Sequence, residues 1–223
     1  MLISDSDLRS FIRESLLKKM LQEKLGASKS GGGPRTSRSS IAGRGSSSPK
    51  EKEDVINIEK MSTSQKQLYD DLFSALKNQN LSIAMVANAQ GESAMNYSIA
   101  GDCGDYGEKN SKRAINTADK GYCCSFGLWQ FNICKGLGVS LLKAYGVNVD
   151  NSTPEEKLAV LSSYDKQVEF MIKEVKKMLG SKISDEKSVS YWVEWFVVNV
   201  ERPKNPAHAI ATRTEIARNI AIA

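Results

Sequence analysis

Residues 81–93 read LSIAMVANAQGES, and this stretch decides how the rest of the chain is interpreted. Positions 81–89 are apolar on nearly every side, as expected of a helix in the middle of a helical domain. The run ends in Gln90-Gly91-Glu92-Ser93, which puts a lone carboxylate at the end of a buried helix. Burial favours the protonated form of a carboxyl group, so Glu92 is a candidate general acid. Its small neighbours leave room for a bulky ligand.

A second motif follows about forty residues later, SFGLWQFN at 125–132. Trp129 and Phe131 offer flat apolar faces on which sugar rings pack, and Gln130 and Asn132 supply hydrogen-bond donors and acceptors. The alternative is that the aromatic residues belong to the core at the start of a helix. Together the two motifs suggest a cleft that holds a sugar polymer beside one proton donor.

The sequence around these motifs predicts a mainly α domain. Ser62 and Gln65 form a potential capping box for a helix that continues to residue 76. Thr153, followed by Pro and two glutamates, starts a helix expected to run to Leu179, and two more helices are expected near 187–199 and 205–222. Residues 96–124 are polar and are expected to form a long loop, in which a short β-hairpin is an option.

The N-terminal part has a different composition. Residues 4–25 predict one amphipathic helix, and the Gly, Ser, Pro and Arg that follow are typical of a flexible linker. We therefore expect a docking helix at 1–25, a basic linker at 26–58 and a folded domain at 59–223. Packing of the helix on its own domain is the alternative.

Charge is distributed unevenly along the chain. Residues 26–50 have a net charge of +5, whereas 51–223 contain 21 basic and 22 acidic residues. The positive net charge of the chain thus comes from its first fifty residues, and nucleic-acid binding by the folded domain is not expected. No stretch reaches the roughly 18 apolar residues of a membrane span, and a signal peptide is not expected either.

Four cysteines lie close together, and the chain has one histidine. Without a C-x-x-C spacing, a metal site is not expected, and nothing in the sequence calls for a cofactor. Free thiols and one or two disulfides that brace the loop remain equal alternatives. The four are Cys103, Cys123, Cys124 and Cys134.

Three segments carry a resemblance to a known family: AQGESAMN at 89–96, SFGLWQFNI at 125–133 and FVVNVERPKNPAHAIATRTEIA at 196–217. In this order they resemble the phage tail lysozymes and, more distantly, goose-type lysozymes and soluble lytic transglycosylases. The resemblance covers roughly residues 65–222. A Trp at position 129, where transglycosylases usually have Met, fits the tail lysozymes better.

The resemblance implies a lysozyme-like fold that cleaves between N-acetylmuramic acid and N-acetylglucosamine. It implies that Glu92 is the catalytic acid and that Gln130 and Asn132 line the cleft, with Ser93 and Trp129 as further substrate-binding candidates. It also suggests that three charged residues near the C-terminus are chiefly structural, although the first of them is kept as a minor candidate for a second carboxylate. These are Glu201, Arg202 and Arg213.

A hydrolase needs a second carboxylate to activate water or to stabilise the oxocarbenium-like transition state. Asp102, Asp105 and Asp119 lie in the long loop, and Asp105 is preferred for its distance after Glu92. If none reaches the cleft, attack by the muramic 6-hydroxyl would make the enzyme a lytic transglycosylase.

The leading hypothesis is a peptidoglycan hydrolase of the phage virion, docked on a phage structural protein through the helix at 1–25. It would be made in the host cytoplasm and act on periplasmic peptidoglycan. A soluble endolysin is the alternative within the same enzyme class. An inactive wall-binding or structural virion protein is the alternative from another class.

Overall fold

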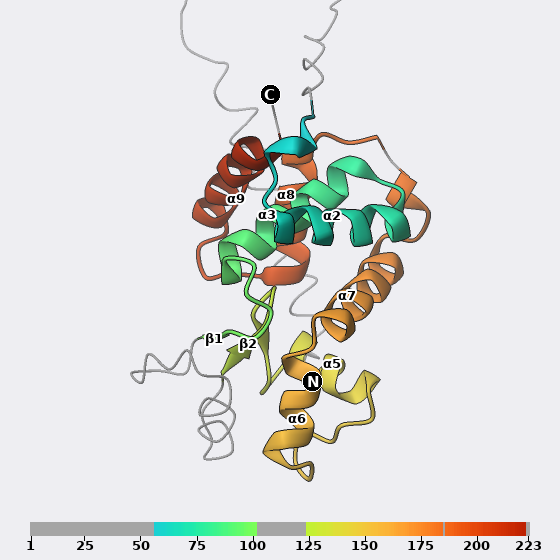
Figure 1. The fold of residues 1–223 in the computed structure, drawn as a ribbon, viewed down its shortest axis with the longest axis vertical. Coiled ribbons are helices and arrows are strands. Elements are labelled where there is room, and N and C mark those ends of the chain that lie inside the picture. Colours follow the sequence, from blue (N-terminus) through green and yellow to red (C-terminus); the bar gives the residue numbers. More distant parts are fainter. Residues whose placement is uncertain (1–55, 102–123, 185, 222–223) are drawn as a thin grey trace, which may run out of the picture. The chain divides into compact units, whose positions relative to one another are not determined.

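The computed structural model describes residues 56–101, 124–184 and 186–221 (Figure 1). The chain divides after Lys50, and all of these residues belong to the second unit, Glu51–Ala223. The predicted docking helix at 1–25 and the linker up to residue 55 lie outside the described residues. The same holds for the three loop aspartates, Asp102, Asp105 and Asp119.

Helix α3 (Gln79–Ser93) is the central element of this unit. Its N-terminus is capped by Asn78, whose Oδ1 accepts a hydrogen bond from the Leu81 N–H at 2.9 Å. All residues from 81 to 89 are buried, because α3 packs against α2, α8 and α9 at once. The apolar run therefore forms the predicted buried central helix.

Three helices pack on α3, namely α2 (Thr63–Leu76), α8 (Val189–Phe196) and α9 (Pro206–Ala221), and a short 3-10 turn, η1 (Ile58–Lys60), packs on α9. The capping box expected at the start of α2 is present, with Ser62 and Gln65 each accepting from the other's backbone N–H. The Asn57 N–H donates to the Ala221 carbonyl at 2.7 Å. Residues 56–58, placed in the linker by the sequence, thus lie against the end of α9.

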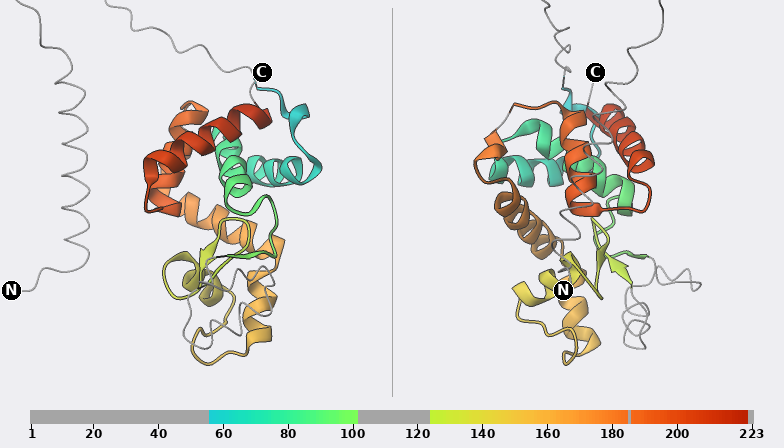
Figure 2. Two further views of the ribbon diagram at one scale, coloured as in Figure 1. Left: turned by 90° about the vertical axis from the view of Figure 1, so that its left-hand side faces the viewer. Right: turned by 180° about the vertical axis from the view of Figure 1, so that it is seen from behind.

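The remaining elements form a second group, which Figures 1 and 2 show on the far side of α7 from α9. It contains α5 (Leu137–Ala144), α6 (Pro154–Leu161) and a small antiparallel sheet in the order β1-β2-β3. The strands are β1 (Ala100–Gly101), β2 (Ser125–Phe126) and β3 (Phe131–Asn132). The motif at 125–132 is therefore a β-hairpin, with Phe126 opposite Phe131.

The helix expected from Thr153 to Leu179 is wrong as a single element. It is two helices, α6 (Pro154–Leu161) and α7 (Tyr164–Leu179), and a short 3-10 turn, η3 (Gly180–Ser184), follows. The chain breaks at Ser162 and Ser163, where the Ser163 hydroxyl caps α7 by accepting from the Lys166 N–H at 3.4 Å. A serine side chain can accept a hydrogen bond from a backbone N–H, so the serine pair favours the start of a new helix over continuation of the first one.

The mainly helical structure predicted from the sequence is confirmed. The apolar residues of the hairpin, including Phe126, Leu128, Trp129 and Phe131, are all buried and join a core shared with α3 and α8. Within the described residues, no helix is both long enough and apolar enough to cross a membrane.

Candidate functional site

Glu92 lies in the last turn of α3 and points away from the core of the helix bundle. The helix ends at Ala94, which adopts a left-handed conformation with φ of 52°. The Glu92 side chain is 24% exposed, so it is partly open to solvent. Its neighbour Ser93 is buried, and the Ser93 hydroxyl donates to the Ala89 carbonyl at 2.9 Å.

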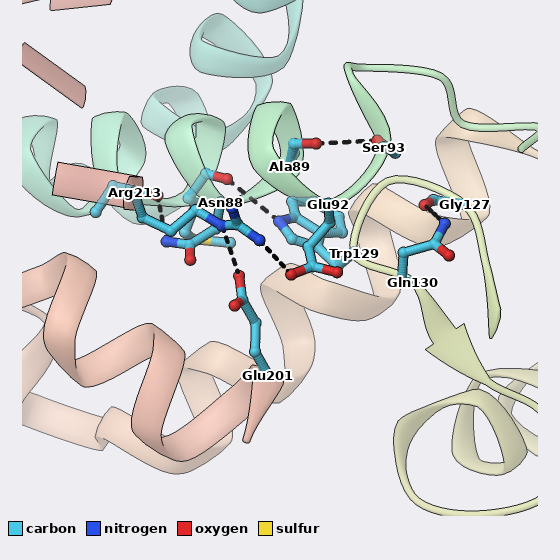
Figure 3. Close-up of polar contacts among 11 residues, drawn as sticks. Asn88, Ala89, Glu92, Ser93, Gly127, Trp129, Gln130, Glu201 and Arg213 are labelled. Atoms are coloured by element: carbon cyan, nitrogen blue, oxygen red, sulfur yellow. Dashed lines mark hydrogen bonds and ion pairs between the residues drawn. The ribbon is translucent and has the colours of Figure 1, made fainter. Parts of the chain in front are cut away.

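The partner of Glu92 is Arg213, which reaches across from α9. One of its terminal nitrogens donates to Glu92 Oε1 in a short ion pair (Figure 3). Gly91 makes this approach possible, because a Cβ at position 91 would collide with the guanidinium group. The C-terminal end of a helix carries partial negative charge, which also favours a cation at this place.

A second carboxyl group, that of Glu201, lies on the other side of Arg213. Its Oε1 is 3.8 Å from Arg213 Nε, and only 4% of its side chain is exposed. Glu201 is the last residue of η4 (Val197–Glu201), a π-helical turn that continues α8 and is closed by the Arg202 N–H on the Val197 carbonyl at 2.8 Å. The extra residue of a π-turn changes the direction of the side chains that follow it.

Burial and, after it, the negative charge of Glu92 together raise the pKa of Glu201 to about 8, against the smaller lowering effect of the positive charge of Arg213. Neither Glu201 oxygen has a hydrogen-bond partner among the described residues. An ionised carboxylate without hydrogen-bond partners at a buried position raises the free energy of the folded protein, and protonation removes most of that cost. Burial therefore favours the protonated form of Glu201.

The hairpin lies next to α3 because Trp129 fixes it there. The indole Nε1 donates to the Met85 carbonyl of α3 at 3.2 Å, and the ring packs edge-on against Phe131. Only 5% of Trp129 is exposed. As placed, the ring holds the hairpin against α3 and offers no free face to a sugar.

Gln130 and Asn132 are the partly exposed polar residues of the hairpin. Gln130 has a positive φ of 48°, and its Nε2 donates to the Gly127 carbonyl at 3.0 Å. In the view of Figure 3, Gln130 lies on the side of Glu92 opposite Arg213. Asn132 Oδ1 accepts from the Cys134 N–H at 3.1 Å.

Gln167 of α7 is fully buried and forms a hydrogen bond with the backbone of the hairpin. Its Oε1 accepts from the Leu128 N–H at 2.8 Å, and its Nε2 donates to the carbonyls of Tyr97 at 2.7 Å and Leu161 at 2.6 Å. Gly127, with φ of 78°, provides the space, since a Cβ there would meet the Gln167 amide. One side chain thus connects three segments of backbone.

Both described cysteines, Cys124 and Cys134, are disulfide-bonded, which favours the disulfide alternative for these two.

In the described ranges, no group of three or more His, Cys, Asp or Glu side chains is placed to hold a metal ion. A pocket of about 530 Å³ lies beside α5, and its lining residues do not include Glu92. The candidate site at the end of α3 is defined by the cluster of Glu92, Arg213 and Glu201.

The structure brings together Glu92 and two residues that the resemblance called structural, Glu201 and Arg213. Asp105, the preferred second carboxylate, lies outside the described residues. Sequence reasoning missed Gln167 altogether. The Glu-Arg-Pro segment was the one sequence feature that pointed to Glu201, and nothing in the sequence predicted that Glu201 lies near Glu92.

The geometry agrees with what comparison with known proteins finds. The family model for the phage tail lysozyme matches residues 63–222, which is more than half of the chain and includes every residue of the site. No curated protein and no solved structure is significantly similar to the chain. The chain belongs to the phage tail lysozyme family, and is thus a lysozyme-like phage protein of the glycosidase type that degrades peptidoglycan.

Proposed function

We propose that this protein cleaves the glycosidic bond between N-acetylmuramic acid and N-acetylglucosamine, with Glu92 as the general acid. The observation that carries the proposal is the position of this carboxyl group. It is partly exposed at the end of the central helix, is held by Arg213 and lies beside a hairpin that presents Gln130. A fixed acid next to polar side chains is what protonation of a sugar oxygen requires.

In the proposed reaction, Glu92 gives its proton to the glycosidic oxygen as the bond from that oxygen to the muramic C1 breaks. The leaving sugar departs as a neutral alcohol, and the muramic ring passes through an oxocarbenium-like state. Water or the muramic 6-hydroxyl then attacks C1. The first gives hydrolysis and the second gives an anhydro sugar.

Asp105 remains the proposed second carboxylate for the hydrolytic route. Gln130 and Asn132 are proposed to contact the sugar, since each residue is partly exposed. Ser93 and Trp129 are buried and engaged with α3, so we propose that they contribute to substrate binding by holding the site in shape.

The proposed setting is the virion. A helix at 1–25 joined by the linker would dock the enzyme on a phage structural protein, and the domain would open the host's periplasmic peptidoglycan locally. If the protein is an endolysin instead, mass spectrometry of purified virions will lack its peptides.

The test is release of soluble muropeptides from purified peptidoglycan by the full chain and by Glu92→Gln. Glu194→Gln, at an exposed position of α8, is the matched control. We expect release by the wild type and the control but not by Glu92→Gln. If Glu92→Gln matches the wild type, the assignment of the acid is wrong.

The masses of the released products distinguish the two reaction types. Hydrolysis adds one water to each cleaved bond, and transglycosylation adds none. If the wild type binds peptidoglycan but releases nothing, the alternative of an inactive wall-binding protein is correct.

A further inference from the structure

Two carboxyl groups and one guanidinium group meet at the end of α3, and their charges do not balance when all three are ionised. Glu92 comes from α3, Glu201 from η4 and Arg213 from α9 (Figure 3). With both carboxyl groups ionised the cluster has one excess negative charge, and with one proton it is neutral. An uncompensated charge is costly in a largely buried site, so about one bound proton is the favoured state.

Other charged groups near Glu201 do not change this count. The groups whose charges act on it are Glu92 and Arg213. Arg202, next in the chain, is exposed and donates its Nε to the Asn199 carbonyl at 3.1 Å. Glu194 on α8 is exposed to water, where its charge is screened.

The position of Glu201 makes it the place where that proton rests before substrate arrives. It is the most buried of the three side chains, 4% exposed against 11% for Arg213 and 24% for Glu92. Arg213 stays charged at all relevant pH values, so it cannot supply the proton. Substrate that covers Glu92 removes water from that carboxyl group and makes the two carboxyl groups more alike in burial.

We propose that Glu92 and Glu201 share a single proton across Arg213, and that Glu201 is the positioning residue that keeps this proton available to Glu92. This inference rests on the proposed role of Glu92 as the acid. When substrate binds, the proton leaves Glu201 and is taken up by Glu92, so that one carboxyl group ionises as the other is neutralised. Glu92 then protonates the leaving oxygen, and the hydroxyl that attacks C1 returns one proton to the pair.

The inference is tested by the pH dependence of muropeptide release by the full chain, wild type and Glu201→Gln. Glutamine keeps the size of the side chain but cannot donate or accept the shared proton. We expect the alkaline limb of the rate profile to move to lower pH by about one unit or more. Release at pH 5 should stay within about threefold of the wild type, whereas at pH 7.5 it should fall about tenfold.

A purely structural role for Glu201 gives a different result. The rate would then fall by the same factor at every pH, or not at all, and the alkaline limb would stay in place; either result overturns the inference. Glu201→Asp keeps a titratable carboxyl group and should restore part of the limb. Glu194→Gln is the control and should leave the profile unchanged.

A measurement on the wild type covers the case in which Glu201→Gln does not fold. In protein labelled with ¹³C at the glutamate carboxyl carbons, the Glu201 signal at pH 6 should have the chemical shift of a protonated acid. A carboxylate shift there contradicts the inference. Failure of the proposed function is separate, because it appears as activity in Glu92→Gln.

Discussion

The two sides of the candidate site are built in different ways. On the helical side, Glu92 stands on a 15-residue helix whose buried face packs on three others. On the hairpin side, Gln130 and Asn132 belong to a turn and a strand of two residues, held by the side chains of Trp129 and Gln167. The acid thus depends on apolar packing and one ion-pair cluster, whereas the proposed sugar contacts depend on a few buried hydrogen bonds.

The largest loss of stability should follow Arg213→Ala, which breaks the helical side. It leaves Glu92 without its partner and Glu201 buried beside an empty space. We expect a loss of about 3 kcal/mol in the free energy of unfolding, the lower end for removal of one partner of a buried pair. Muropeptide release should fall about a hundredfold, since the acid is no longer held in place.

Urea unfolding and the release assay measure these two effects, with Arg218→Ala at an exposed position of the same helix as the control. A stability equal to that of the control would show that the cluster does not hold α9 to α3.

The hairpin side should respond to Gln167→Met. Methionine has the length of glutamine but leaves the Leu128 N–H and two carbonyls without their partner. We expect a loss of about 2–3 kcal/mol, because buried polar groups are left unpaired. Release should fall about tenfold as the hairpin shifts relative to Glu92.

Thermal unfolding and the release assay test this variant against Lys176→Met, which is exposed on the same helix. If Gln167→Met is as stable and as active as its control, the hairpin is held by apolar packing and the contrast between the two sides is wrong.

Stability should depend on pH through Glu201. Its pKa is raised from 4.5 to about 8, so its stabilising contribution is complete below pH 4.5 and is lost as the pH rises through 8. Relative to Glu201→Gln, the wild type should therefore become less stable across this window, by at most about 1.4 kcal/mol per pH unit. Urea unfolding of both proteins at pH 5, 7 and 9 measures the difference. Parallel curves would mean that Glu201 does not keep its proton.

The smallest effect is expected for Gln130→Ala. The substitution removes the amide but keeps a residue with a Cβ at the same positive φ, so backbone strain is unchanged. If Gln130 contacts the sugar through one hydrogen bond, KM should rise about fivefold, equivalent to about 1 kcal/mol. Kinetics on a soluble glycan oligomer test this. An unchanged KM would remove Gln130 from the proposed sugar contacts.

The sequence predicted the helical side far better than the hairpin side. The apolar run at 81–89 and the capping box at Ser62 are local patterns, and both appear in the structure as expected. The hairpin depends on Gln167, which is 39 residues from Leu128 in the chain. No local pattern reports a contact between residues so far apart.

The contacts of Glu92 with Arg213 and Glu201 could not be predicted from local sequence patterns for the same reason. Arg213 is 121 residues away from Glu92, and Glu201 stands at the end of a π-turn that the sequence did not predict. The break at Ser162 was missed because the apolar periodicity continues on both sides of it. Periodicity predicts that a helix exists but not where a side-chain cap interrupts it.

The most direct test of the helical side is the rate of muropeptide release by Glu92→Gln at pH 5. Glutamine removes the proton donor and keeps the length of the side chain. We expect a fall of about 10²–10⁴-fold, the usual contribution of a general acid. A folded Glu92→Gln protein that releases muropeptides at the wild-type rate would contradict the assignment of Glu92 as the acid.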